Sequence, residues 1–194
     1  MSINSLIDSL STSGWYVWDD FLNPSQIQVI KNCIPNKLQD ARIGHLDSLQ
    51  DNKSIRGDLT VWLEPEMGDP IASYMAQMDS IRQALNCELY LGLRDFETHF
   101  CCYPNGAFYK KHIDNYKGKG RRKITTVLYM NESWQSGDGG ELVMYDSADN
   151  ELLKLEPFCG RMIFFMSEDF PHEVLPTQKK RESIAGWFLT ESLL

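Results

Sequence analysis

Apolar residues in the first half of the chain recur at intervals that predict three helices. The intervals of three and four residues that characterise an amphipathic helix occur in residues 3–14, 23–34 and 69–89. Asn23 and Pro24 suit the N-cap and the first position of the second helix, because an asparagine side chain accepts backbone hydrogens there and proline lacks one. The N-terminal half is therefore expected to be mainly helical.

Extended and irregular segments separate these helices, and after residue 93 the period changes to two. Residues 15–22 and 59–64 indicate short strands, whereas residues 41–58 are polar and interrupted by glycine, which predicts a long loop. Alternating segments then follow one another at short intervals: 95–103, 124–131, 140–146, 152–157, 161–166, 172–176 and 183–189.

Many short strands with no helix between them predict an antiparallel sandwich or jelly roll rather than a parallel sheet. The expected fold class is mainly β with flanking helices (α+β). Residues 1–194 are expected to form one domain, with helical support over about 1–93 and a β core over about 94–194.

Composition and charge narrow the class of protein. The 194 residues are 42% hydrophobic and 24% charged, with a net charge of −8, which is ordinary for a globular protein and disfavours nucleic-acid binding. No apolar run approaches ~20 residues and the N-terminus lacks a signal-peptide pattern, so no membrane association and a cytoplasmic location are expected. The five cysteines follow no zinc-site spacing and are expected to be reduced thiols.

Two candidate metal ligands lie one residue apart in "YKKHIDNY", residues 109–116. His112 and Asp114 would point to the same face of a strand, although this pair alone also suits a surface turn. His172, in "FPHEVLP", is a third candidate, because a jelly roll brings distant strands side by side. Two imidazoles and one carboxylate form the facial triad of non-haem Fe(II) oxygenases, which leaves positions open for a bidentate 2-oxoacid and O2.

A carboxylate-binding arginine would complete such a site. Arg181 follows His172 by nine residues, and arginine is the residue for two-pronged carboxylate recognition. On an alternating strand it shares a face with Ser183, Ala185 and Trp187, which suits a pocket floor; the alternative is a solvated charge at a strand edge. Tyr129 offers a second donor to the same carboxylate, or else it is an ordinary core aromatic.

Taken together, these segments resemble the prolyl hydroxylases of the Fe(II)/2-oxoglutarate dioxygenase superfamily, in particular the hypoxia-inducible-factor type and its bacterial relatives. The resemblance is carried by "CYPNGAFYKKHIDNYKGKGRRKITTVLYMN", "GGELVMY", "EPFCGRMIFFMSEDFPHEVLP" and "RESIAGWFL". The segments "GWYVWDDFL" and "SIRGDLTVWLE" extend it over roughly residues 10–190.

This resemblance implies a double-stranded β-helix, which is a distorted jelly roll, and a role for each site residue. The implied iron ligands are His112, Asp114 and His172. Together with Arg181, they form the implied catalytic set. The implied contacts of 2-oxoglutarate are Arg181, Tyr129, Tyr103, Val127, Leu142 and Val174. The implied substrate contacts are Trp187, Tyr109, Arg56, Asp58 and Arg122, with Arg121 or Arg122 as the partner of the Arg56–Asp58 pair.

The implied activity is hydroxylation of a prolyl residue in a protein or peptide, coupled to conversion of 2-oxoglutarate to succinate and CO2. Fe(2+), O2 and 2-oxoglutarate are required, and L-ascorbate is expected to support turnover. Two alternatives stay open: the same chemistry on a small molecule or free amino acid, and a metal- and 2-oxoglutarate-binding sensor without catalysis. A monomer or weak dimer is expected.

The resemblance assigns no firm role to four further features. The basic run 117–123 either attracts an acidic partner segment or only solubilises the chain, and the loop 40–58 is expected to close over the peptide. His99 alternates onto the face of Cys101 and Tyr103, where we expect a hydrogen-bonding pocket residue rather than a fourth ligand. His45, within the loop, is expected to have no chemical role.

Overall fold

The computed structural model of the protein describes residues 2–41, 54–115 and 120–192. His45, most of the predicted loop and Lys117 and Lys119 of the basic run lie outside the described residues. The predicted helices are confirmed as α1 (Ile3–Thr12), α2 (Pro24–Cys33) and α3 (Asp69–Leu89), with a short 3-10 turn, η1 (Pro65–Met67), before α3.

The start of α2 shows why the sequence forms a helix at this point. The Asn23 side chain accepts a hydrogen bond from the backbone N–H of Gln26, and the Gln26 side chain accepts one from the Asn23 N–H, both at 2.9 Å. This reciprocal capping box satisfies two backbone donors that a helix start leaves unpaired.

Two antiparallel sheets form the β core, as the alternating pattern predicted. The larger has the order β1-β9-β6-β11-β4-β3-β2 within the described residues, and the smaller has the order β5-β10-β7-β8. The larger comprises β1 (Trp15–Trp18), β2 (Gln39–Asp40), β3 (Leu59–Trp62), β4 (Asp95–Tyr103), β6 (Arg122–Tyr129), β9 (Met162–Met166) and β11 (Arg181–Leu189). The smaller comprises β5 (Tyr109–His112), β7 (Leu142–Tyr145), β8 (Glu151–Leu155) and β10 (His172–Val174).

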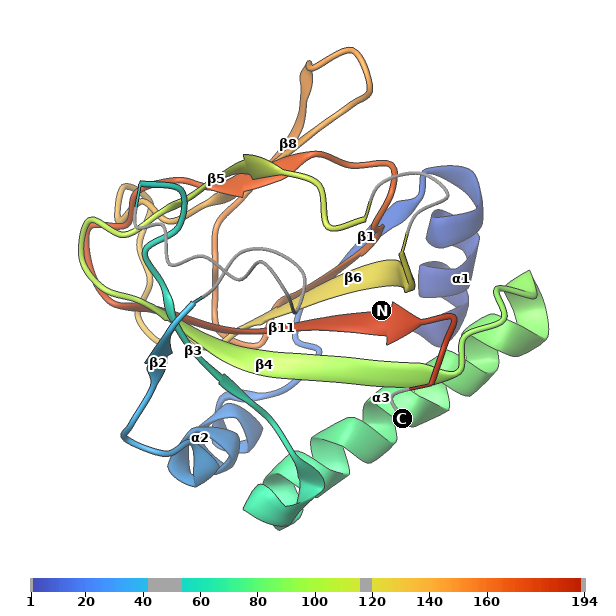
Figure 1. Cartoon of the computed structure of the whole chain (residues 1–194), viewed down its shortest axis with the longest axis horizontal. Helices are drawn as coiled ribbons and strands as arrows, with labels where there is room; N and C mark the ends of the chain where they lie inside the picture. The colour runs from blue at the N-terminus through green and yellow to red at the C-terminus, as the bar shows by residue number, and fades with distance from the viewer. Residues whose placement is uncertain (1, 42–53, 116–119, 193–194) are drawn as a thin grey trace.

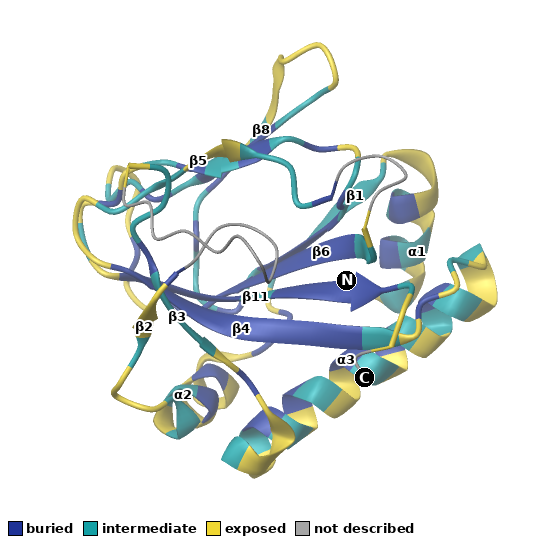
Figure 2. Cartoon of the chain, viewed as in Figure 1, coloured by how far each residue is buried: buried dark blue, intermediate teal, exposed yellow. Residues whose placement is uncertain are grey.

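The helices cover the outer face of the larger sheet, and α3 runs beneath β4 and β11 (Figure 1). Phe100, Ile184 and Phe188 point toward the helices and join their apolar faces in one cluster. The opposite face of the larger sheet packs toward the smaller sheet. Because both faces are covered, β4, β6 and β11 are buried along most of their length (Figure 2). This arrangement confirms the jelly-roll expectation.

Two further observations concern the predicted environment of the protein. The five cysteines are all free thiols, in agreement with the expectation: Cys33, Cys87, Cys101, Cys102 and Cys159. Within the described ranges, no helix combines the length and apolar character that crossing a membrane requires.

Candidate metal centre

The predicted triad assembles between the two sheets. His112, the last residue of β5, and His172, the first of β10, are register partners on adjacent strands. Together with Asp114 they offer ligand atoms that all lie within 4.8 Å of one another. Nε2 of His112 is 3.4 Å from Oδ1 of Asp114, and Nε2 of His172 is 3.8 Å from Oδ2. The strand pairing therefore brings together residues that are far apart in the sequence.

Asp114 reaches this centre in a different way from the one the sequence suggested. β5 ends at His112, so Asp114 lies in the bend that follows and not on the strand. The prediction that His112 and Asp114 converge is confirmed, but the strand alternation offered as its cause is wrong. The bend carries the carboxylate across toward the larger sheet.

Hydrogen bonds orient both histidine side chains. Nδ1 of His112 lies 2.8 Å from the carbonyl oxygen of Lys110, and Nδ1 of His172 lies 3.1 Å from that of Phe170. A ring nitrogen that donates to a carbonyl leaves the opposite nitrogen, Nε2, as the lone-pair ligand. Each histidine thus presents Nε2 to the centre.

The protonation states also suit a metal ion. Burial lowers the pKa of His172 to about 4, with His112 acting in the same direction. Burial alone would raise the pKa of the Asp114 carboxyl, but the neighbouring His172 and His112 outweigh it and hold that pKa well below its usual range. Metal ligands must be deprotonated, so near neutral pH a neutral imidazole and a carboxylate are ready to bind. The donor set fits Fe(II).

The guanidinium of Arg181 is buried in the β core. Arg181 is 1% exposed; its Nε donates to the Gly140 carbonyl at 2.8 Å and its Nη1 donates to Oγ of Ser183 at 3.2 Å. Nη2 of Arg181 and the hydroxyl of Tyr129 have no hydrogen-bond partner among the described residues. The Arg181 guanidinium carbon is 4.9 Å from the Tyr103 ring centroid and 5.2 Å from that of Tyr129.

These two buried donors fit the distal carboxylate of 2-oxoglutarate. An unpaired buried donor is costly, and more so when it is charged, whereas a carboxylate would accept hydrogen bonds from both groups. Burial raises the pKa of Tyr129 to about 12, so its hydroxyl keeps the proton that it would donate. The structure brings Arg181 and Tyr129 together, as the sequence predicted.

Apolar side chains pack around Tyr129 and Tyr103, the two rings that lie beside the Arg181 guanidinium. Val127 and Leu142 belong, with Tyr129, to the cluster between the sheets. Val174 packs with Tyr103 in a small neighbouring cluster. The predicted apolar contacts are thus near the predicted polar ones.

A stack of side chains connects the 54–58 segment with one metal ligand. The ring of Tyr109 lies parallel to that of His112, with centroids 3.7 Å apart, and the Arg56 guanidinium carbon lies 4.5 Å from the Tyr109 ring centroid. Arg56 donates two hydrogen bonds to Asp58, at 2.8 and 2.6 Å. The predicted Arg56–Asp58 pair is therefore present and lies next to the site.

The expected partner of that pair is wrong. Arg121 and Arg122 both bind Glu97 on β4, at 3.2 and 2.8 Å, and the Arg122 guanidinium lies 3.5 Å from the Trp187 ring centroid. Both carboxylate oxygens of Asp58 already accept hydrogen bonds from Arg56. β6, which begins at Arg122, and β4, which carries Glu97, flank the same strand β11, so the long arginine side chains reach Glu97. No sequence signal singled out Glu97.

His99 is buried and lies outside the ligand group. Its Nδ1 lies 3.1 Å from Sγ of Cys101, and its ring contacts those of Trp62 and Trp187 at centroid distances of 5.1 and 5.3 Å. Burial lowers its pKa to about 4, with Arg56 acting in the same direction. These contacts agree with the expected hydrogen-bonding role.

Sequence reasoning missed Thr125 and Ser167, which support the site, and it missed the contact of Trp187 with Asp114. Thr125 and Trp187 each donate a hydrogen bond to Oδ2 of Asp114 at 2.8 Å, and Ser167 lies 2.8 Å from the Thr125 hydroxyl. The period of two along residues 122–129 puts Thr125 on the same face as Val127 and Tyr129, so strand alternation was a usable signal for Thr125. Ser167 gave none.

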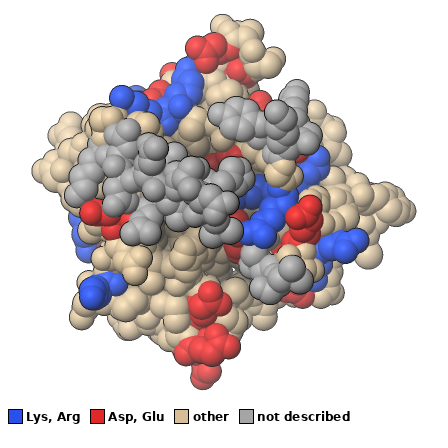
Figure 3. Space-filling view, viewed as in Figure 1, with Lys and Arg blue, Asp and Glu red and all other residues tan. Residues whose placement is uncertain are grey.

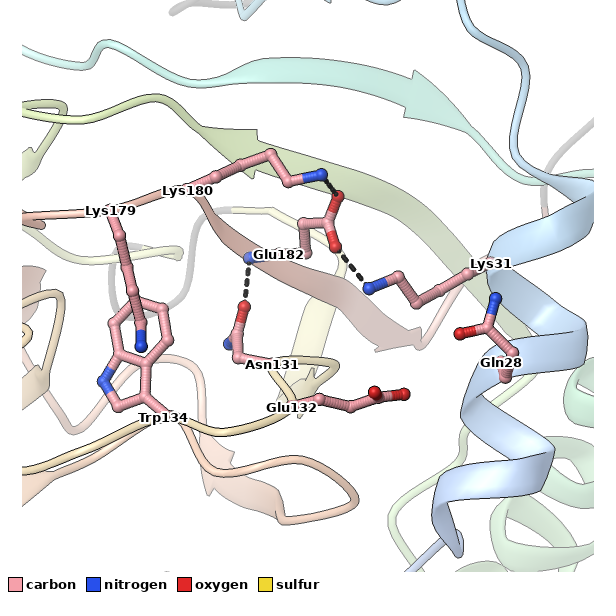
Figure 4. A pocket seen from close by; sticks show the side chains of 8 residues that line it. All are labelled: Gln28, Lys31, Asn131, Glu132, Trp134, Lys179, Lys180 and Glu182. Carbon is pink, nitrogen blue, oxygen red and sulfur yellow. Dashed lines mark hydrogen bonds and ion pairs between the residues drawn. The ribbon is translucent and has the colours of Figure 1, made fainter.

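A cavity of about 310 Å³ elsewhere in the described structure contains none of the predicted site residues (Figure 4). Glu182 forms ion pairs with Lys31 at 2.6 Å and with Lys180 at 2.7 Å, so its carboxylate is already paired within the protein. The face shown in Figure 3 likewise carries basic and acidic side chains in small interleaved groups. Neither feature competes with the triad as a catalytic site.

Comparisons with known proteins point the same way. The sequence model of the 2OG-Fe(II) oxygenase superfamily matches residues 98–189. A crystal structure of a Pseudomonas putida prolyl-4-hydroxylase is similar at 36% identity and a TM-score of 0.87, over 98% of this chain and 100% of that one. A Trichoplax adhaerens prolyl hydroxylase in complex with a hypoxia inducible factor oxygen degradation domain peptide fragment is similar at 26% identity and a TM-score of 0.80, over 97% and 89%.

A curated relative, human Egl nine homolog 1, is 30% identical over 200 residues, which are 97% of this chain. The same match covers 46% of that protein. The chain thus spans about half the length of this relative.

Proposed function

The chain belongs to the 2OG-Fe(II) oxygenase superfamily, and from this premise we propose that it hydroxylates a prolyl residue in a protein or peptide. The observation that carries the proposal is the presence of two features on the adjoining strands of the β core. One is a His112–Asp114–His172 ligand set, and the other is a buried, incompletely paired Arg181 beside Tyr129. The first feature binds a metal, and the second selects a co-substrate with a distal carboxylate.

The co-substrate is held by the base of the pocket. Arg181 and Tyr129 bind the distal carboxylate of 2-oxoglutarate, while Gly140 and Ser183 fix the guanidinium from behind. Iron bound by the triad, together with 2-oxoglutarate and O2, supplies the oxidation that yields succinate, CO2 and a hydroxyl group on the substrate carbon. L-ascorbate is proposed to sustain activity.

The protein's own contribution is to orient and shield the reacting groups. Trp187 and Thr125 hold the Asp114 carboxylate, and carbonyl contacts hold the two histidines, so the ligand positions are set before any metal binds. Apolar walls that include Val127 and Val174 exclude water from the oxidation. Leu142 and Tyr103 complete these walls.

The peptide is proposed to approach over the opposite side of the triad. Trp187, with the Arg122 guanidinium on its face, and Tyr109, with Arg56 on its face, flank the metal ligands. Aromatic rings backed by cations suit the apolar ring of a proline and the polar backbone around it. The P. putida relative is described as a prolyl-4-hydroxylase and the T. adhaerens relative as bound to a peptide, which supports this substrate class.

Mass spectrometry tests the proposal. The protein is incubated with Fe(II), 2-oxoglutarate, O2 and ascorbate and a library of proline-containing peptides, and the expected result is a mass gain of one oxygen atom on proline with matching succinate. The same peptides with proline replaced by alanine are the matched substrate control, and His172→Ala is the inactive protein control.

Two outcomes would overturn the proposal in different ways. Succinate formed only with free amino acids or other small molecules would keep the chemistry but change the substrate. Tight binding of metal and 2-oxoglutarate with no succinate under any condition would indicate a sensor instead of an enzyme.

A further inference from the structure

Asp114 is held by the larger sheet, whereas the other two ligands belong to the smaller sheet. His112 and His172 lie on β5 and β10 of the smaller sheet. Oδ2 of Asp114 instead accepts hydrogen bonds from Thr125 on β6 and Trp187 on β11, which are register partners in the larger sheet. A metal at this centre therefore joins the two sheets, and the position of Asp114 depends on donors from the larger one.

The Thr125 hydroxyl has a second neighbour behind it. Its Oγ1 lies 2.8 Å from Oγ of Ser167, just beyond the end of β9. Thr125 is 1% exposed and Ser167 is 0% exposed, so water does not replace either contact at low cost.

The direction of these hydrogen bonds follows from proton counting. As a metal ligand Asp114 is a carboxylate, which only accepts hydrogen bonds. The single hydroxyl proton of Thr125 is therefore given to Asp114, and the contact between the two hydroxyls requires Ser167 to donate to Thr125. The chain of donors runs Ser167 to Thr125 to Asp114.

From this order we infer that Ser167 is a positioning residue for the metal ligand Asp114 and acts only through Thr125. A hydroxyl that accepts a hydrogen bond becomes a stronger donor, so Ser167 polarises the Thr125 hydroxyl toward Oδ2. Oδ2 is then held by Thr125 and Trp187, while Oδ1, which accepts from neither of them, is presented toward Nε2 of His112. The inference rests on the triad as the metal site, not on the identity of the substrate.

Metal titration without 2-oxoglutarate or peptide tests this role. Mn(II) is titrated by calorimetry into metal-free wild type, Thr125→Val, Ser167→Ala, the double variant and Thr125→Ser. Thr125→Val is expected to raise the Mn(II) Kd by about tenfold or more, as for other partners of metal ligands. Ser167→Ala is expected to raise it by about threefold to tenfold, the range of one neutral hydrogen bond.

The decisive comparison is the effect of Ser167→Ala on the Mn(II) Kd when residue 125 is threonine, valine or serine. In the Thr125→Val background, Ser167→Ala is expected to leave the Mn(II) Kd unchanged, because the relaying hydroxyl is absent. In the Thr125→Ser background, which keeps a hydroxyl at position 125, Ser167→Ala is expected to raise the Mn(II) Kd again. Thr126→Val is the matched control. Thr126 is also a buried threonine of β6, but it points to the other face of the sheet, and its hydroxyl donates to the carbonyl of Gly186. Its Mn(II) Kd is expected to equal that of the wild type.

Equal weakening by Ser167→Ala with and without the Thr125 hydroxyl would overturn the inference, as would an equal loss in Thr126→Val. If the valine variants do not fold, the Ser167→Ala effect in the Thr125→Ser background still decides it, and its absence there refutes the relay. Absence of peptide hydroxylation would sink the proposed function without altering these Mn(II) affinities, so the two failures are distinguishable.

Discussion

Replacement of Arg181 by lysine separates co-substrate binding from metal binding. Arg181 is fully enclosed, with Nε on the Gly140 carbonyl, Nη1 on Ser183 and Nη2 unpaired beside the Tyr129 hydroxyl. Lysine keeps the positive charge but concentrates it on one nitrogen, which cannot hold the Gly140 carbonyl and bind a carboxylate in two places.

The size of the effect follows from the hydrogen bonds that lysine cannot make. A hydrogen bond to a charged group contributes about 1.5–3 kcal/mol, so removal of one to two such bonds weakens 2-oxoglutarate binding by about 3 kcal/mol. That corresponds to roughly a hundredfold increase in Kd, since about 1.4 kcal/mol is a factor of ten. Arg181 is not one of the three metal ligands, so the Mn(II) Kd is expected to change by less than about threefold, within the spread of such measurements.

Calorimetry measures both constants on the same preparation: Mn(II) into metal-free protein, then 2-oxoglutarate into the Mn(II)-loaded protein. Lys180→Gln is the control, because Lys180 is adjacent in sequence but binds Glu182 in the separate cavity. Parallel losses of metal and 2-oxoglutarate affinity, or an unchanged 2-oxoglutarate Kd, would refute the assignment of Arg181.

Four further predictions test the pocket and the fold. Tyr129→Phe removes one buried donor and should weaken 2-oxoglutarate binding by about tenfold, within the range for a hydrogen bond to a charged group, while calorimetry shows Mn(II) binding unchanged. Gly140→Ala should weaken 2-oxoglutarate binding as well, because the glycine has φ +65° and a Cβ would lie 2.9 Å from Cδ of Arg181; an unaltered affinity would contradict the packing. Burial keeps His99 neutral and lowers its pKa to about 4 from an ordinary 6.5. As pH falls, His99 is therefore protonated in the unfolded chain before it is protonated in the folded protein. The free energy of unfolding should accordingly fall as pH drops from about 6.5 toward 4. For His99 alone the loss of stability at pH 5 is about 2 kcal/mol, and urea unfolding of metal-free His99→Asn should show a correspondingly flatter pH dependence than wild type. Asn23→Ala should lower the free energy of unfolding by about 1 kcal/mol through loss of the α2 cap, and a change in Mn(II) affinity would be unexpected.

The sequence determined the elements and the chemical types of the site. Helical and alternating periods located the helices and the main strands, because local side-chain spacing reflects which face of each element is buried. The metal ligands His112, Asp114 and His172 and the carboxylate-binding Arg181 were identified by side-chain chemistry, which does not depend on conformation. The short strand β2 was not predicted, because it consists of two exposed residues and such a segment shows no alternation of apolar and polar positions.

Only the tertiary structure decided how these residues are held. The register of β5 against β10 places His112 opposite His172, and the bend after β5 turns Asp114 toward Thr125. The Ser167 contact belongs to the same group of findings, as does the pairing of Arg122 with Glu97 in place of Asp58. Such contacts join strands that are tens of residues apart, and a shift of register by one residue would turn each side chain to the other face. Local sequence carries no record of that register, because it results from the packing of the two sheets as a whole.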